Sequence, residues 1–154
     1  MQELIKRISD SSVETRREAV ESIKGRKDNT YIPLLLKAME DQSWRVRKTA
    51  VDILFDDYPV EKYIPGLIEL LSIEDNAGAR NSAIEALIRL GKKATVYLIA
   101  AFKTPNRDVR KFIIDVLGEQ RDPRSLPGHS TSPRPLAEPI RSFPPPARLA
   151  QRST

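Results

Sequence analysis

The sequence predicts an all-α protein built from about four repeated helical hairpins, an α-α superhelix. The first observation is residues 43–54, SWRVRKTAVDIL, where apolar side chains recur every three or four positions and form one stripe along a helix. The stripe consists of Val46, Ala50, Val51 and Leu54. Asp41 or Ser43 stands where a side chain can accept hydrogen bonds from the first turn. The second observation is that the pattern returns at residues 11–23, 76–87 and 106–118.

An arginine stands at the same register of all four windows. These are Arg16, Arg47, Arg80 and Arg110, separated by 31, 33 and 30 residues. A period of this length is typical of stacked helical repeats, in which each hairpin covers the apolar face of the next. We therefore predict a repeat domain over residues 1–127. Its units lie near 10–40, 41–73, 74–103 and 104–127, and a half-repeat helix at 2–9 precedes them.

A second helix is expected after the first in each unit. The segments are YIPLLLKAME, YIPGLIELLS and TVYLIAAFK, with Pro33 and Pro65 in a first turn, where proline sacrifices no hydrogen bond. The fourth unit lacks such a segment, so we expect its first helix to expose apolar surface. The residues concerned are Val109, Phe112, Ile113, Val116 and Leu117. Truncation of a longer array, or a homodimer formed through the exposed terminal repeat, is the corresponding hypothesis.

The repeated pattern resembles HEAT repeats, in particular the short repeats of phycobilisome-lyase-type HEAT-like proteins. The likeness is carried by DQSWRVRKTAVDIL…YIPGLIELL, by DSSVETRREAVESIKG…YIPLLLKAM and by VRKFIIDVLGEQRDPRSLP. It implies that the acidic residue at each helix entry and the arginine six residues later form a ladder between repeats. The ladder comprises Asp10 and Arg16, Asp41 and Arg47, Glu74 and Arg80, and Arg110, whose unit has Thr104 instead of an acid. The resemblance also implies that the second helices line the inner surface.

Composition narrows the functional classes. The 154 residues are 31% charged and 40% hydrophobic, which is typical of a globular chain, and no apolar run is long enough to span a bilayer. There is no cysteine and no apolar leader at the N-terminus, so a cytoplasmic location is expected. The formal net charge of +5 divides into +2 for residues 1–127 and +3 for residues 128–154. Nucleic acid is therefore an unfavoured partner, because proteins that bind it normally have a concentrated basic face.

Residues that could carry catalysis are scarce, so we predict no enzyme, no cofactor and no metal site. The single histidine, His129, has no neighbour of a type that would complete a zinc or nucleophile site. Asp56, Asp57 and Glu61 form an acidic cluster, for which a solvated turn is favoured over a weak cation site. The recurring arginines suit either phosphate binding or pairing between repeats, and the second interpretation is favoured because buried charges are normally paired.

A protein partner is therefore predicted, bound on the second helices. The candidate residues are Lys37, Lys62, Glu69, Tyr97 and Lys103, together with Trp44 of a first helix as an aromatic anchor. The alternative interpretation of Trp44 is that it packs over the turn of a neighbouring repeat. Two other functions stay open: a bilin lyase or phycobilisome-related chaperone-like factor, and a nucleic-acid-binding HEAT-like protein.

The C-terminal segment 128–154 differs in composition. Six of the 12 prolines fall within it, including Pro144–Pro146 in succession. Proline is incompatible with helix interiors, so this tail is predicted to be disordered and partly extended. A ligand for a proline-recognising domain, or a basic anchor, is the functional alternative.

Overall fold

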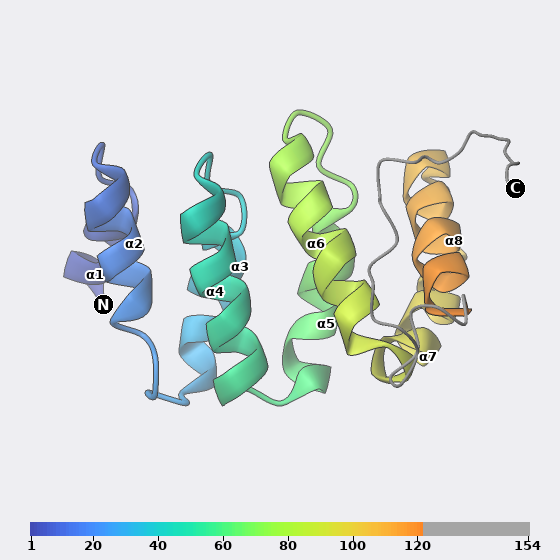
Figure 1. The fold of residues 1–154 in the computed structure, drawn as a ribbon, viewed down its shortest axis with the longest axis horizontal. Coiled ribbons are helices and arrows are strands. Elements are labelled where there is room, and N and C mark those ends of the chain that lie inside the picture. The colour runs from blue at the N-terminus through green and yellow to red at the C-terminus, as the bar shows by residue number, and fades with distance from the viewer. Residues whose placement is uncertain (122–154) are drawn as a thin grey trace, which may run out of the picture. The chain divides into compact units, whose positions relative to one another are not determined.

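The computed structural model describes residues 1–121, and every regular element in this range is helical (Figure 1). The elements are α1 (Gln2–Ile8), α2 (Val13–Glu21), the 3-10 turn η1 (Asn29–Tyr31), α3 (Ile32–Ala38), α4 (Trp44–Asp57), α5 (Val60–Leu70), α6 (Ala77–Leu90), α7 (Lys92–Ala101) and α8 (Arg107–Arg121). The predicted all-α helical repeat is confirmed. The tail at 128–154, with His129, lies outside the described residues.

Met1–Leu117 form one compact unit, and the packing described below is that of this unit. The second unit begins at Gly118, and its described part is the last turn of α8. Within residues 1–121, each helix is too short or too polar to traverse a bilayer.

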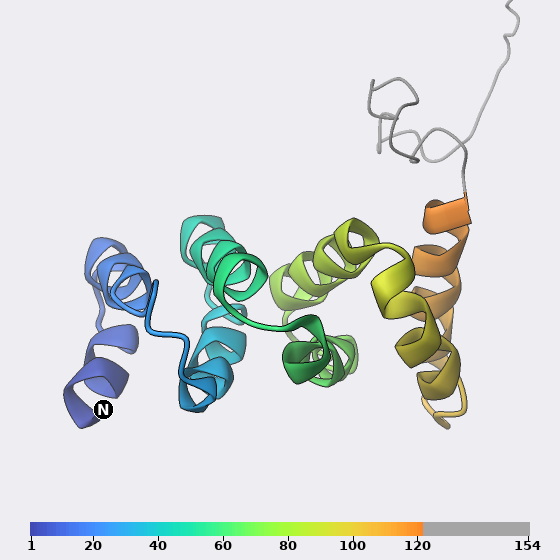
Figure 2. The same cartoon turned by 90° about the horizontal axis from the view of Figure 1, so that it is seen from below.

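Two rows of helices pack side by side in Met1–Leu117. The first helices of the predicted repeats form one row, α2–α4–α6, and the second helices form the other, α3–α5–α7 (Figure 2). Between the rows, the closest packing joins α1 to α2, α3 to α4 and α5 to α6. The helices α1, α3 and α5 therefore each pack most closely on the first helix that follows them, so these tight hairpins are offset by half a repeat from the predicted units.

Side-chain caps begin the first helices at one repeating register. The residues that accept a hydrogen bond from the first turn are Ser12, Ser43, Asn76 and Asn106. The residue two positions before the cap also accepts a hydrogen bond, from the backbone N–H of the capping residue. Asp41 accepts from Ser43 in this way, and Asp10 and Thr104 do the same in their units. Each cap satisfies a backbone N–H that has no partner inside the helix. Asp41 and Ser43 thus both act at the start of α4.

The apolar stripe of α4 is buried, as its spacing predicts. Val46, Ala50 and Leu54 are fully buried, and Val51 is 7% exposed. They belong to one hydrophobic core to which all the helices from α1 to α8 contribute. Because each hairpin covers its neighbour, this core is continuous along the stack.

The first helix of the fourth predicted unit is α8, and its apolar face was expected to be exposed. This expectation is wrong for three of the five residues concerned. Val109, Ile113 and Val116 of α8 are 5%, 0% and 0% exposed and belong to the same core as Ala94 and Leu98 of α7. The physical reason is that the apolar stripe of α8 joins the core of the preceding helices, so its burial does not depend on a second helix of its own unit. Phe112 and Leu117 are half-buried against this core.

Two adjacent isoleucines test this placement of α8. Ile113→Ala removes a fully buried side chain and should lower the free energy of unfolding by about 2–5 kcal/mol, through lost burial and the cavity left behind. Ile114 is 55% exposed, so Ile114→Ala should change the same quantity by less than about 0.5 kcal/mol. Urea unfolding followed by circular dichroism measures both values. Equal losses from the two variants would contradict the placement.

Candidate functional site

The four recurring arginines make the same bond within their own units. In each, Nη1 donates to the backbone carbonyl six residues earlier, at 2.7–2.9 Å. The pairs are Arg16 with Asp10, Arg47 with Asp41, Arg80 with Glu74, and Arg110 with Thr104. The bond ties the first helix to the loop that enters it. These guanidinium groups therefore fasten each loop at a fixed register.

Contacts of these arginines with the neighbouring unit differ along the chain. Arg16 binds Asp41 with two hydrogen bonds, Nε to Oδ2 at 2.7 Å and Nη2 to Oδ1 at 3.1 Å. Both side chains are largely buried, at 14% and 9% exposure, and the hydrogen bond raises the pKa of Arg16 above its usual range. Such a forked pair is the strongest form of this interaction. An acid–arginine link between repeats is thus present where the first unit meets the second.

Farther along, other side chains take the place of the carboxylate. Arg47 Nε donates to the Ser82 hydroxyl at 2.9 Å, and a Cβ added at Gly78 would lie 2.9 Å from Arg47 Nη1. Glycine at that position leaves room for the guanidinium. Arg80 lies over the ring of Phe112, 5.9 Å from its centroid, in a cation–π contact. Arg16, Arg47 and Arg80 therefore each contact the next unit as well as their own loop, which favours the structural interpretation of these arginines.

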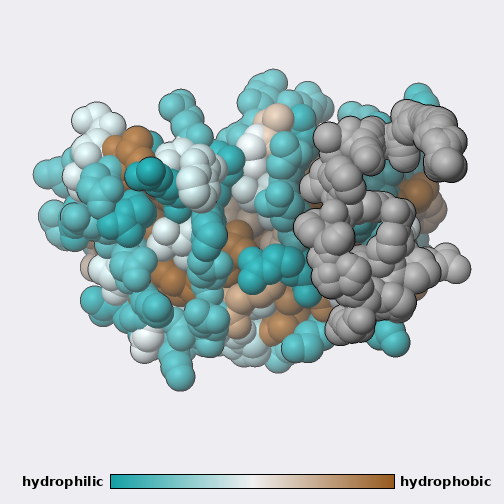
Figure 3. All heavy atoms as spheres, viewed as in Figure 1, coloured by the Kyte–Doolittle hydropathy of each residue, from teal (hydrophilic) through white to brown (hydrophobic). Residues whose placement is uncertain are grey.

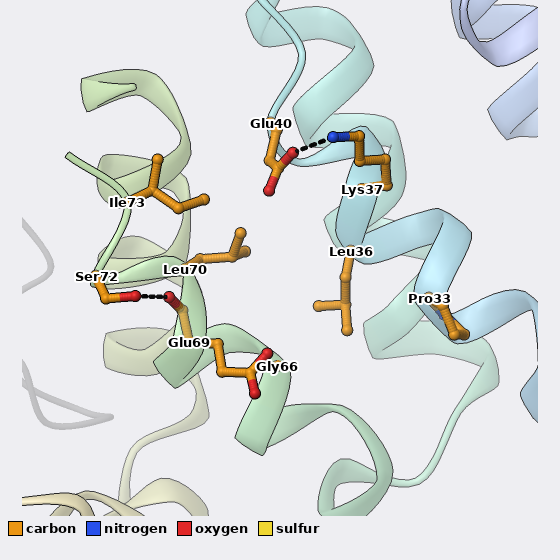
Figure 4. Close-up of a pocket in the computed structure, with 9 residues that line it drawn as sticks. All are labelled: Pro33, Leu36, Lys37, Glu40, Gly66, Glu69, Leu70, Ser72 and Ile73. Atoms are coloured by element: carbon orange, nitrogen blue, oxygen red, sulfur yellow. Dashed lines mark hydrogen bonds and ion pairs between the residues drawn. The ribbon is translucent and has the colours of Figure 1, made fainter. Parts of the chain in front are cut away.

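A groove lies on the other row of helices, between α3 and α5 (Figure 4). It has a volume of about 600 Å³. Its lining residues are Pro33, Leu36, Lys37 and Glu40 from α3 and its C-terminal end, and Gly66, Glu69, Leu70, Ser72 and Ile73 from α5 and the loop after it. Apolar side chains and charges of both signs thus meet in one open depression.

Gly66 determines how closely the two walls of this groove approach. A Cβ at this position would overlap Leu36, which points from α3 toward α5 (Figure 4). In the preceding second helix the corresponding position is Leu34, judged from the shared Tyr-Ile-Pro start of the two segments. A residue larger than glycine would therefore push the Leu36 side chain out of its place.

Two of the predicted partner-binding residues lie in this groove, Lys37 and Glu69. Lys37 Nζ pairs with Glu40 Oε1 at 2.8 Å, and Lys37 remains 71% exposed. Both pair members lie on the α3 side, opposite Glu69 (Figure 4). The groove therefore has a mixed-charge edge on α3 and an acidic edge on α5.

The other predicted residues lie elsewhere. Lys62 of α5 and Lys103 after α7 are exposed, and Tyr97 of α7 is half-buried. Trp44, 60% exposed, lies at the start of α4 and lines a separate depression between α4 and α6 with Arg47 and Lys48. The structure therefore does not bring Trp44 together with the second-helix residues.

Sequence reasoning missed the apolar part of the groove. Leu36, Leu70 and Ile73 lie along it, but each fits the general apolar pattern of a second helix. The one available signal was Gly66, a helix-destabilising residue in the interior of an apolar segment. A glycine in such a place often marks a close approach of two elements.

No cluster of three histidine, cysteine or carboxylate side chains suited to a metal ion occurs within residues 1–121.

A family model for HEAT repeats matches residues 1–88, which is more than half of the chain. The chain belongs to the HEAT repeat family. Members of this family are commonly protein-interaction scaffolds and are generally not enzymes. That its repeats are of the phycobilisome-lyase type stays a prediction. No curated protein matches the chain.

Adjacent arginines of α2 offer a test of the link between units. Arg16→Gln should lower the free energy of unfolding by about 2 kcal/mol, because it leaves the largely buried Asp41 carboxylate without its partner. Arg17 pairs with Glu14 at the surface, so Arg17→Gln should leave stability almost unchanged. Chemical denaturation of both variants measures the difference. Similar effects of the two changes would show that the Arg16–Asp41 pair does not hold the units together.

Proposed function

We propose that this HEAT repeat protein is a non-catalytic scaffold, located in the cytoplasm, that binds a protein partner along α3, α5 and α7. The observation that carries the proposal is the open groove between α3 and α5, with Leu36 and Leu70 in its lining and charged side chains at its edges. Apolar contact surrounded by a polar rim is how protein interfaces combine affinity with specificity. A groove of this kind fits a segment of another protein.

The charges in the groove favour a protein over a nucleic acid. Glu40 pairs with Lys37 on the α3 side and Glu69 lies on the α5 side, so a phosphate backbone would meet two carboxylates for one ammonium group. Nucleic-acid sites instead concentrate basic side chains on one face. A polypeptide segment can present both signs of charge and match this arrangement.

The other row of helices is less suited to recognition. Its arginines are engaged with neighbouring loops and units, and the face formed by α2, α4 and α6 is mainly hydrophilic (Figure 3). Lys48 and Asp52 on α4 already pair with each other at 2.8 Å. This division supports placing the partner on the second helices.

A charge exchange across the groove tests the proposal. The double variant Lys37→Glu with Glu69→Lys keeps the net charge but reverses the pattern that a partner meets. Affinity capture from a lysate of the producing cells, with the full chain as bait and mass spectrometry as readout, should lose the specific partner, with at least about a tenfold fall in recovery.

The matched control exchanges the surface pair of α4, Lys48→Asp with Asp52→Lys, which also conserves net charge. It should capture the partner as well as the unaltered chain does. A partner retained by the groove variant and lost by the control would place recognition on the first helices. Failure of the unaltered chain to capture any protein would count against a scaffold altogether.

A further inference from the structure

The segment that contains α7 has an unusual charge. Residues 86–107 hold five basic side chains and no acidic one. These are Arg89, Lys92, Lys93, Lys103 and Arg107. The neighbouring second helices are mixed, since α5 carries Glu61 and Glu69 as well as Lys62. Arg89 ends α6 and Arg107 begins α8, so the basic residues of the second-helix row itself are Lys92, Lys93 and Lys103.

The lysines of this segment are not neutralised by the described part of the chain. Lys92, Lys93 and Lys103 are exposed, and no carboxylate of residues 1–121 forms an ion pair with any of them. Lys37 of α3, in contrast, has Glu40 as a partner. Ammonium groups at both ends of α7, none of them paired with a carboxylate of residues 1–121, attract an acidic ligand that lies along the helix.

Large apolar side chains lie exposed among these lysines. Val96 is 66% exposed, Ile99 58% and Phe102 40%, whereas Ala94 and Leu98 of the same helix are fully buried. Burial of the opposite side fixes the helix, so Val96 and Ile99 face outward. Contiguous exposed apolar residues with a charged rim are typical of interaction sites.

We propose that these six residues, Lys92, Lys93, Val96, Ile99, Phe102 and Lys103, form a docking surface for an acidic protein segment with apolar anchors. The inference rests on the proposed scaffold function and names the chemistry of its partner. Carboxylates of the segment pair with the lysines, and its apolar side chains cover Val96 and Ile99. The charges select and steer the partner, while the apolar contact supplies most of the affinity.

Charge also argues against two other occupants. Residues 128–154 of the chain hold four arginines and one glutamate, so their net charge has the same sign as the surface. An anionic bilayer would match the lysines, but it favours a broad basic surface, and α5, which packs beside α7, carries Glu61 and Glu69 against Lys62. A separate acidic protein segment meets neither difficulty.

The test uses the full chain and a fluorescent synthetic helical peptide with leucine at every third or fourth position and glutamate between. Binding is followed by fluorescence anisotropy. The triple variant Lys92→Glu, Lys93→Glu, Lys103→Glu should weaken binding by about tenfold or more, and added salt should weaken binding to the unaltered chain. Val96→Ser with Ile99→Ser should weaken it comparably, because the apolar contact is lost.

The matched control reverses three exposed lysines outside this segment, Lys6→Glu, Lys24→Glu and Lys27→Glu, and should bind the peptide within about twofold of the unaltered chain. Equal binding of a peptide with glutamine in place of glutamate would overturn the proposal, as would an unaffected α7 triple variant. Binding of anionic phospholipid vesicles through the same lysines, without peptide binding, would assign the surface to a membrane.

The two proposals can fail separately. If the groove exchange at Lys37 and Glu69 abolishes capture of a partner while the acidic peptide ignores α7, the scaffold function stands and the α7 surface is wrong. If the peptide binds α7 but the groove exchange changes nothing, the partner docks at α7 and not in the groove.

Discussion

The stack depends on covering the apolar face of each hairpin with the next hairpin at a fixed register. The recurring arginine bond sets that register, since Nη1 reaches the carbonyl six residues earlier in every unit at nearly the same distance. A guanidinium group suits this task because its planar fork can bind the loop with one nitrogen and the next unit with the others. Arg16 does so through Asp41, Arg47 through Ser82 and Arg80 through Phe112.

Variation in the second partner does not disturb the first bond. A carboxylate, a hydroxyl and an aromatic ring are very different partners, yet the bond to the loop carbonyl is retained beside each of them. The second partner can vary because the loop carbonyl already supplies part of the hydrogen bonding that a guanidinium group removed from water requires. The link between units therefore varies from a forked ion pair to a cation–π contact while the spacing of the helices is preserved.

The sequence was sufficient for the helices, their order and the apolar stripe of α4, because these follow from local periodicity and helix-capping residues. It was insufficient for the choice of helix pairs, which depends on how loops direct the chain in space. The burial of Ile113 was missed for the same reason, because it depends on contacts with the common core that residue spacing does not reveal. The groove was missed for a related reason: it arises from Gly66 and Leu36, whose approach is a property of two helices 30 residues apart.

The division of labour between the rows follows from these contacts. Side chains of the first helices hold loops and neighbouring units, so a change there alters stability. Side chains at the outer edges of the second helices make few such contacts, so the charge pattern can change from mixed at α3 to basic at α7 without cost to the stack. A repeat protein of this design can present different chemistry at each unit while one core supports all of them. Binding specificity would then depend on which second helices a partner spans.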